Sequence, residues 1–238
     1  MSEREFTLIG EQILGVGRNV RSISGIKIID LSKTLCASKT DVPGDLGYSD
    51  PPTLIKKVPW VTTDVKPYYV TKLSFSPHSA THIDAPKHVT AEGKSTEDVS
   101  SELVGKCLIV NIKNLGVDEG NDLIQKIVKG QTIVAITGDA DTVIDTSFRD
   151  EIIQAQPKAV VFGICVNCVG VDDTLAYCRN DIPMIMDAEN LDALQDEDIV
   201  FALPIRISDV EASPVRLFAM RFIDATVDEC STYDKPWE

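Results

Sequence analysis

The chain has 238 residues, of which 43% are hydrophobic and 25% are charged, and its formal net charge is −14. This length and composition predict one globular domain with a sizeable core. The acidic charge argues against a nucleic-acid-binding protein, which needs a basic face, and against an anionic membrane as a partner.

The beginning of the chain, "MSEREFTLIGEQILG", has acidic residues early and no long apolar run, which is not the pattern of a signal peptide. No window approaches the roughly 18 apolar residues of a membrane span. We therefore expect a cytoplasmic protein. In that compartment cysteines are by default free thiols, and the chain has six: Cys36, Cys107, Cys165, Cys168, Cys178 and Cys230.

The first part of the chain predicts an arm, a strand and a long loop. Residues 1–24 contain several breakers and are expected to form a loose arm or a short helix that precedes the domain, which would span residues 25–238. "IKIIDLS" predicts a strand. The turn-rich stretch "KTDVPGDLGYSDPP" follows, and a loop of that length is usually functional or mobile. "YYVTKLSFS" alternates as a half-buried strand does.

Strands and helices alternate in the second part of the chain. Strands are expected at residues 106–113, 131–140, 157–165, 182–188, 200–208 and 215–223. Helices are expected at residues 118–129 (with Gly130 past the end), 145–156 and 172–181, with a short helix or turn at 189–198. Asp145 or Thr146 is the expected cap of the second helix. The pattern predicts an α/β domain with a central mixed β-sheet or barrel-like core flanked by helices.

All three histidines of the chain lie in the stretch "FSPHSATHIDAPKHV". Two prolines bracket this window and disfavour a continuous helix through it. If "ATHID" is extended, His82 and Asp84 point to the same face, and a turn could bring His78 round to join them. Two imidazoles and a carboxylate on one side form a set of ligands for a divalent cation, with positions left for water and substrate.

A catalytic role follows from the same window. A cation in such a set lowers the pKa of water and polarises a carbonyl group. His88 then has the right chemistry for a general base, since the pKa of imidazole lies near neutrality. A single histidine in a loop is usually a surface residue without a role, but three with an interleaved aspartate favour a metal site. Two histidines and one aspartate suit zinc or manganese equally.

The stretch "HSATHIDAPKH" resembles the His-x-Gly-Thr-His-x-Asp-x-Pro-x-His signature of the cyclase family of metal-dependent hydrolases, which includes kynurenine formamidase, isatin hydrolase and a dienelactone hydrolase. "IIDLSKTL", "VPGDLGYSDPP", "VAITGDAD", "KAVVFGIC", "IPMIM" and "FALPIRISDVEASPVRLFA" are similar to further segments of that family. The likeness covers about residues 26–223.

The resemblance implies a swivelling β/β/α fold with a barrel-like sheet, and a homodimer or homotetramer. It implies hydrolysis of an amide or ester carbonyl in a small aryl or cyclic substrate, with zinc or manganese as cofactor. Residue by residue, His78, His82 and Asp84 match the metal ligands, and His88 matches the catalytic histidine.

The chain departs from the family at several positions. Ala80 replaces the glycine of the signature, which matters if the backbone needs a positive φ there. Kynurenine formamidase holds a second zinc with a further His and a Glu, but this chain has no other His and has Met186 in place of the Glu. Cys165 replaces a family aspartate. The sequence therefore predicts one metal ion per subunit. The alternative is a catalytically inactive cyclase-fold protein that binds a small ligand or a protein partner.

Other residues carry weaker expectations. Trp60 could stack on an aromatic substrate or could simply pack. Asp45 and Tyr48 lie in the long loop, which could close over the site, although such residues often only shape turns. Asp187 and Glu189 are candidate replacements for the missing Glu, although such residues more often lie on a solvated face. "CVNC" (residues 165–168) has the spacing of a redox or metal motif but has no second pair, which favours structural thiols.

Overall fold

The computed structural model describes residues 23–37, 42–43, 49–60, 68–99, 103–139, 143–163 and 170–224. The chain divides into two compact units, of which Ile29–Ala219 contains all of the elements that build the site. The other unit consists of Met1–Ile28 and Met220–Glu238. The predicted arm (residues 1–24) lies almost entirely outside the described residues, and its boundary stays a prediction.

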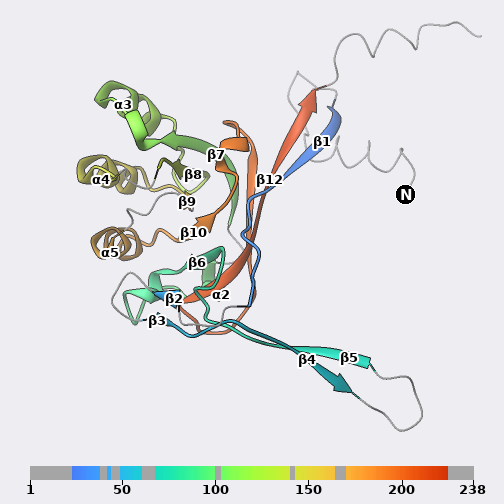
Figure 1. Ribbon diagram of the computed structural model, residues 1–238. Coiled ribbons are helices and arrows are strands. Elements are labelled where there is room, and N and C mark those ends of the chain that lie inside the picture. Colours follow the sequence, from blue (N-terminus) through green and yellow to red (C-terminus); the bar gives the residue numbers. More distant parts are fainter. Residues whose placement is uncertain are drawn as a thin grey trace, which may run out of the picture. The chain divides into compact units, whose positions relative to one another are not determined.

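Seven strands close into a barrel (Figure 1). They follow the order β12–β11–β7–β8–β9–β10–β6, and β6 pairs again with β12, which completes the ring. β1 (Ile23–Asp30) pairs with β12 in addition. The bounds of the seven are β6 (His82–Asp84), β7 (Val104–Asn111), β8 (Thr132–Thr137), β9 (Ala159–Gly163), β10 (Met184–Ala188), β11 (Ile199–Pro204) and β12 (Ala212–Asp224).

The central strands β7, β8, β9 and β10 are parallel to one another. Parallel neighbours need crossover connections, and helices α3 (Val117–Gln125), α4 (Thr146–Ala155) and α5 (Val171–Arg179) supply them. In Figure 1 these three helices lie in a row along one side of the strands. The short helix α2 (Thr96–Val99) precedes β7. The mixed barrel with four α-helices confirms the predicted α/β architecture.

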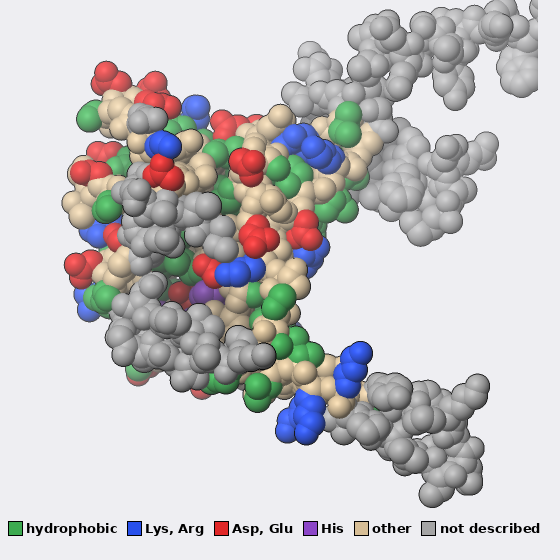
Figure 2. All heavy atoms as spheres, in the orientation of Figure 1, with side chains coloured by type: hydrophobic (Ala, Val, Ile, Leu, Met, Phe, Trp, Pro, Cys, Tyr) green, Lys and Arg blue, Asp and Glu red, His purple; other side chains and the backbone are tan. Residues whose placement is uncertain are grey.

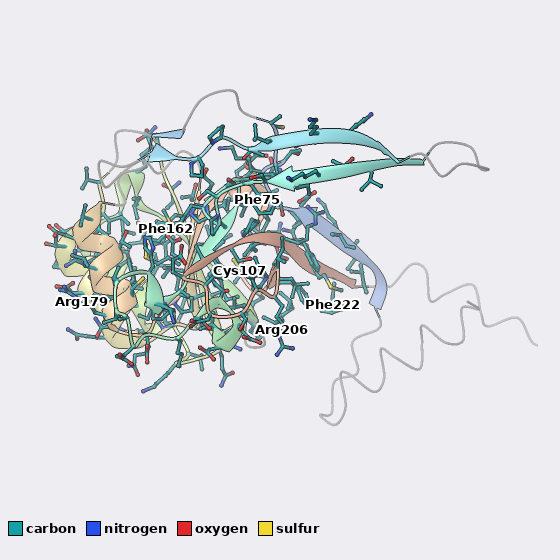
Figure 3. The ribbon with its side chains drawn as sticks, turned by 90° about the horizontal axis from the view of Figure 1, so that it is seen from below. Phe75, Cys107, Phe162, Arg179, Arg206 and Phe222 are labelled. Carbon is teal, nitrogen blue, oxygen red and sulfur yellow. The ribbon has the colours of Figure 1, made fainter. Side chains whose placement is uncertain are left out.

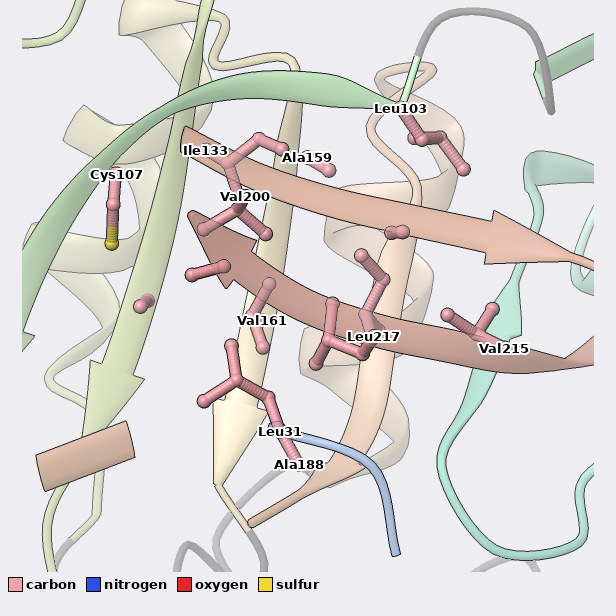
Figure 4. Close-up of a cluster of buried hydrophobic side chains, with 14 of the residues drawn as sticks. Leu31, Leu103, Cys107, Ile133, Ala159, Val161, Ala188, Val200, Val215 and Leu217 are labelled. Atoms are coloured by element: carbon pink, nitrogen blue, oxygen red, sulfur yellow. The ribbon is translucent and has the colours of Figure 1, made fainter. Parts of the chain in front are cut away.

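Two hydrophobic clusters form the core. One fills the barrel with buried apolar side chains that point toward one another, among them Leu31, Ile133 and Leu217 (Figure 4). The other lies between the strands and the helices and includes Phe162 of β9 (Figure 3), whose ring meets that of Tyr177 in α5 edge to face. β8 is buried at five consecutive positions because its two faces contact both clusters.

Two small sheets complete the described structure. β2 (Val42–Pro43) pairs with β3 (Ser49–Asp50), within the long loop. β4 (Leu54–Trp60) and β5 (Tyr68–Ser74) form a two-stranded antiparallel sheet. The sequence predicted β5 but not β4. Three single-turn 3-10 helices also occur, η1 (Pro86–His88), η2 (Ile112–Asn114) and η3 (Leu191–Ala193).

Local chemistry sets the helix boundaries. Asp145 caps α4 because its carboxylate accepts hydrogen bonds from the backbone N–H groups of Ser147 and Phe148, which confirms the first of the two predicted caps. The predicted helix at residues 118–129 ends early, at Gln125. The remaining residues turn toward Gly130, which has φ +66° and precedes β8.

No helix in the described ranges is long and apolar enough to span a membrane.

Candidate metal centre

The histidine window folds as a turn, a short strand and a 3-10 turn. The turn closes when Ser79 donates its backbone N–H to the carbonyl of Ser76 at 3.0 Å, and Ser76 Oγ also accepts the N–H of His78 at 3.2 Å. Ala80 then has φ +57°, a left-handed conformation that is unusual for a residue with a side chain. This reversal brings His78 back toward the strand β6, which contributes His82 and Asp84.

β6 is held on both sides. It pairs with β10 on one side, where Met184 is the partner of Asp84, and with β12 on the other side, where Ala212 is the partner of Asp84. His82 and Asp84 therefore sit between two strands that come from much later in the chain. This double pairing fixes their backbone, so that their side chains start from defined positions on one face of the barrel wall.

η1 fixes His88. Pro86 begins this turn and is buried, and the N–H of His88 donates to the carbonyl of Ala85 at 2.8 Å. Gly93 packs so closely on η1 that a Cβ there would come within 2.6 Å of the backbone of Pro86. The ring centroid of His88 consequently lies 4.7 Å from that of His78.

The predicted ligands come together. His78 Nδ1 lies 2.9 Å from Asp84 Oδ1, and His82 Nε2 lies 3.6 Å from the same oxygen. Ligand atoms that share one zinc ion at about 2.0–2.2 Å are roughly 2.8–3.6 Å apart for angles between 90° and 109°, so these spacings fit a common cation. Within the described ranges, His78, His82 and Asp84 are the only group of three such side chains with ligand atoms mutually within 4.8 Å.

Burial and hydrogen bonding support the same use. The side chains of His78, His82 and Asp84 are only 13%, 11% and 9% exposed. Figure 2 shows little of the histidine colour at the surface, in a recess beside an acidic side chain. Although His78 Nδ1 is close, Asp84 Oδ1 is buried and accepts no well-directed hydrogen bond from any described residue. An oxygen in that position needs a partner, and a cation supplies one.

The carboxylate of Asp84 is ionised in this setting. Burial acts to raise its pKa, but the neighbouring His82 and His78 outweigh burial, so that the pKa lies below the ordinary value for aspartate. Cys178 of α5 is also near, since its Sγ lies 3.8 Å from the carbonyl of Ala85. Burial, with a smaller contribution from Asp84, raises the pKa of this thiol to about 12, and Cys178 does not belong to the group of ligand atoms mutually within 4.8 Å.

The structure adds one residue that the sequence did not single out. Glu211, which directly precedes β12, places Oε1 3.6 Å from His78 Nε2. Its position is set by the sheet, because the carbonyl of Glu211 accepts the N–H of Ala85 at 2.9 Å. No local pattern marks this glutamate, and only the pairing of β12 with β6 reveals it.

The other predicted site residues are placed differently. Asp187 is not in the metal-ligand group, and its carboxylate forms an ion pair with Lys33 at 3.1 Å. Trp60 ends β4, but its side chain is not described. Asp45, Tyr48 and both cysteines of "CVNC" lie outside the described residues. Their roles stay predictions.

Comparison with known proteins identifies a family and similar enzymes. The model of the Cyclase family matches residues 29–174. Kynurenine formamidase of Bacillus thuringiensis (strain Al Hakam) is 27% identical over 204 residues, which cover 79% of this chain and 94% of that protein. Kynurenine formamidase of Delftia acidovorans is 25% identical over 211 residues, which cover 80% and 95%.

Solved structures with the same fold include isatin hydrolases. An isatin hydrolase bound to the product analogue thioisatinate superimposes with a TM-score of 0.67 at 16% identity, over 93% of this chain and 100% of that chain. Isatin hydrolase A from Ralstonia solanacearum gives a TM-score of 0.67 at 15% identity, over 92% and 97%. At such identities these structures establish the fold.

Proposed function

The chain belongs to the Cyclase family, and on this basis we propose that it is a metal-dependent hydrolase that cleaves an amide or ester carbonyl of a small aryl or cyclic substrate. The observation that carries the proposal is the convergence of His78, His82 and Asp84, with His88 beside them. The kynurenine formamidases and isatin hydrolases among the similar proteins support the substrate class.

The roles of the residues follow from their placement. His78, His82 and Asp84 would hold one zinc or manganese ion per subunit. When bound, the cation supplies Lewis-acid polarisation of the substrate carbonyl and lowers the pKa of water. His88 accepts the proton of the attacking water and returns it to the leaving group, an action that typically contributes about 10²–10⁴-fold to the rate. The oxygen of water forms a new C–O bond to the carbonyl carbon, and the bond from that carbon to the leaving group, C–N in an amide or C–O in an ester, then breaks.

A direct test combines metal analysis with a substrate screen. Purified protein is analysed for metals and then assayed with zinc or manganese on N-formylkynurenine, isatin and small lactones. We expect one equivalent of metal and turnover of at least one class. Protein that takes up no divalent ion after addition of zinc or manganese would contradict the proposal.

His88 separates catalysis from metal binding. We expect His88→Ala to lower kcat by about 10²–10⁴-fold while it retains the metal, because the imidazole lies beside the ligand group without belonging to it. A variant of His88 with unchanged kcat would remove the proposed general base.

A second candidate is a catalytically inactive protein of the same fold that binds a small ligand or a partner protein. The observation that favours it is Met186, which occupies the position where the family resemblance places the second-site glutamate of kynurenine formamidase. The same screen separates the two functions. Metal-replete wild-type protein that binds isatin or N-formylkynurenine in calorimetry but converts none of the substrates would support the binding function.

We also propose that the chain forms a homodimer or homotetramer. The sheet of β4 and β5 supports this, because Leu54, Ile55, Val70 and Leu73 are 44–54% exposed on only two strands. A two-stranded sheet with exposed apolar side chains gains stability when it is covered. Light scattering on the purified chain tests this proposal, and a monomer at micromolar concentration would refute it.

A further inference from the structure

The two nitrogens of His78 face two different carboxylates. Nδ1 lies 2.9 Å from Asp84 Oδ1, and Nε2 lies 3.6 Å from Glu211 Oε1. His82 Nε2 lies 3.6 Å from the same Asp84 Oδ1. The side of His78 that carries Nδ1 therefore points to the shared centre, and the side that carries Nε2 points to Glu211.

His82 is held the opposite way round. Its Nδ1 lies 2.9 Å from the carbonyl oxygen of Ala80, which only accepts hydrogen bonds, so Nδ1 carries the proton and donates it. Its Nε2 is then the atom with a lone pair that faces Asp84. The left-handed conformation of Ala80 aims this carbonyl at the ring of His82.

Glu211 has the position of a supporting group rather than of a ligand. It does not belong to the group whose ligand atoms lie mutually within 4.8 Å. Its side chain is 41% exposed, but its backbone is fixed, since Ala212 is paired with Asp84 and the carbonyl of Glu211 is bonded to Ala85. A glutamate anchored in this way loses less entropy on engaging His78 than one on a loop would.

We infer that Glu211 is a positioning residue whose carboxylate faces Nε2 of His78 as an ion-pair partner, at 3.6 Å, keeps the proton of that ring on Nε2, and so presents Nδ1 to the cation. A histidine that binds a metal usually donates its other N–H to a carboxylate or carbonyl, which fixes the tautomer and increases the basicity of the ligating nitrogen. Here Glu211 serves His78 as the Ala80 carbonyl serves His82. The two histidines consequently bind through opposite nitrogens. This inference rests on the proposed metal-dependent function, and it adds a residue to that site.

Metal affinity gives the first test. Metal-free wild-type protein and variants are titrated with zinc against a competing chelator. Because loss of such a supporting group costs about 10–100-fold in metal affinity, we expect that factor for Glu211→Ala. Glu211→Gln keeps an acceptor oxygen without the charge and should lose less than about tenfold. The control Glu197→Gln removes the same charge from an exposed glutamate that pairs with Lys106, and should bind zinc as the wild type does.

Imidazole NMR gives a readout that does not depend on activity. With only three histidines, the ring nitrogens of the ¹⁵N-labelled, zinc-loaded protein can be assigned by single substitutions. We expect His78 to be ligated through Nδ1 with a proton on Nε2, and His82 to be ligated through Nε2 with a proton on Nδ1. Glu211→Ala should shift the His78 Nε2 signal and leave the His82 signals in place.

The outcomes are distinguishable. Unchanged zinc affinity in Glu211→Ala, or ligation of His78 through Nε2 in the wild type, would overturn the role of Glu211 while the metal site stands. Failure of the wild-type protein to bind zinc would overturn both the role and the proposed function. Glu211→Ala is uninformative if circular dichroism shows that it does not fold. In that case the tautomers of His78 and His82 in the wild type and the zinc affinity of Glu211→Gln still test the role of Glu211.

Discussion

Met186 lies directly across the sheet from His82, as its partner in the pairing of β10 with β6. The residues that pair in this way point to the same face, so a carboxylate at position 186 would reach the space beside His82. In this chain a thioether occupies that place, and Met186 packs against the hydrophobic cluster between the strands and the helices. The pairing of β10 with β6 thus places an apolar side chain beside the group of His78, His82 and Asp84.

The first prediction concerns the metal ligands. We expect Asp84→Asn to lower zinc affinity by more than the roughly 10–100-fold that a supporting residue contributes, because it removes the charged ligand atom that both imidazoles face. Competition titration measures the affinity. The matched control is Asp187→Asn, which removes an equal charge from β10, the strand paired with β6. This substitution breaks only the ion pair with Lys33. Equal affinities in both variants would contradict the assignment of Asp84.

The sequence predicted the fold correctly where its local patterns of apolar residues are strong. The parallel strands and the helices between them each span five or more residues with clear apolar periodicity, so the α/β architecture and most elements follow from the sequence. The closure of the barrel does not. β6 has three residues, too few to show a period, and its partners β10 and β12 are about a hundred residues or more distant in the chain. β4 was missed because it contains Pro59 and two lysines.

The same distinction holds at the site. His78, His82 and Asp84 could be predicted because they lie within seven residues and a single turn joins them. Glu211 could not, because it reaches His78 only through the pairing of β12 with β6. Residue types alone also could not tell which nitrogen of His82 faces Asp84, because that depends on the contact of its Nδ1 with the carbonyl of Ala80.

The second prediction is a pH dependence. Arg216 donates two hydrogen bonds to the carboxylate of Asp30, at 2.7 and 2.9 Å, and with the N–H of Ser32 it holds the pKa of Asp30 below the ordinary value of 3.8. A lowered folded-state pKa contributes stability that is present above the ordinary value and is lost as the pH falls through the lowered one. Both side chains are more than half exposed, so we expect Asp30→Asn to cost about 1 kcal/mol or less at pH 7.

Urea unfolding of the wild type and of Asp30→Asn between pH 7 and pH 3 measures this difference. The gap in unfolding free energy should be constant down to about pH 5 and should narrow toward pH 3. Glu97→Gln, which breaks a pair with the 77% exposed Arg206, is the control with a similar charge change. A gap that widens in acid would show that Asp30 does not act through a lowered pKa.

The third prediction concerns thiol reactivity. Burial, with smaller contributions from nearby carboxylates, raises the pKa of Cys107 and of Cys178 to about 12. At pH 8 only about one molecule in ten thousand then carries the reactive thiolate, and neither side chain is accessible. We expect both cysteines to resist iodoacetamide in the native protein and to react in urea, whereas the exposed Cys36 reacts in both. Peptide mass spectrometry reads each site, and rapid native labelling of Cys178 would mean that α5 opens away from the site.

The last prediction returns to the turn between the histidines. Ala80 has φ +57°, where a residue with a Cβ is strained by roughly 1–2 kcal/mol relative to glycine. Glycine also increases the conformational entropy of the unfolded chain, which destabilises the fold by about 0.4–1 kcal/mol. Ala80→Gly should therefore stabilise the fold by up to about 1 kcal/mol in thermal or urea unfolding. Ala176→Gly, in the middle of α5, is the control and should destabilise the fold by about 1 kcal/mol, because helical φ gives glycine no advantage.

Zinc affinity should stay within a few-fold of the wild-type value in Ala80→Gly, since the carbonyl that accepts from His82 Nδ1 is retained. Equal destabilisation by both substitutions would mean that the turn does not hold Ala80 in the left-handed region, and the placement of the Ala80 carbonyl that sets the tautomer of His82 would lose its structural basis.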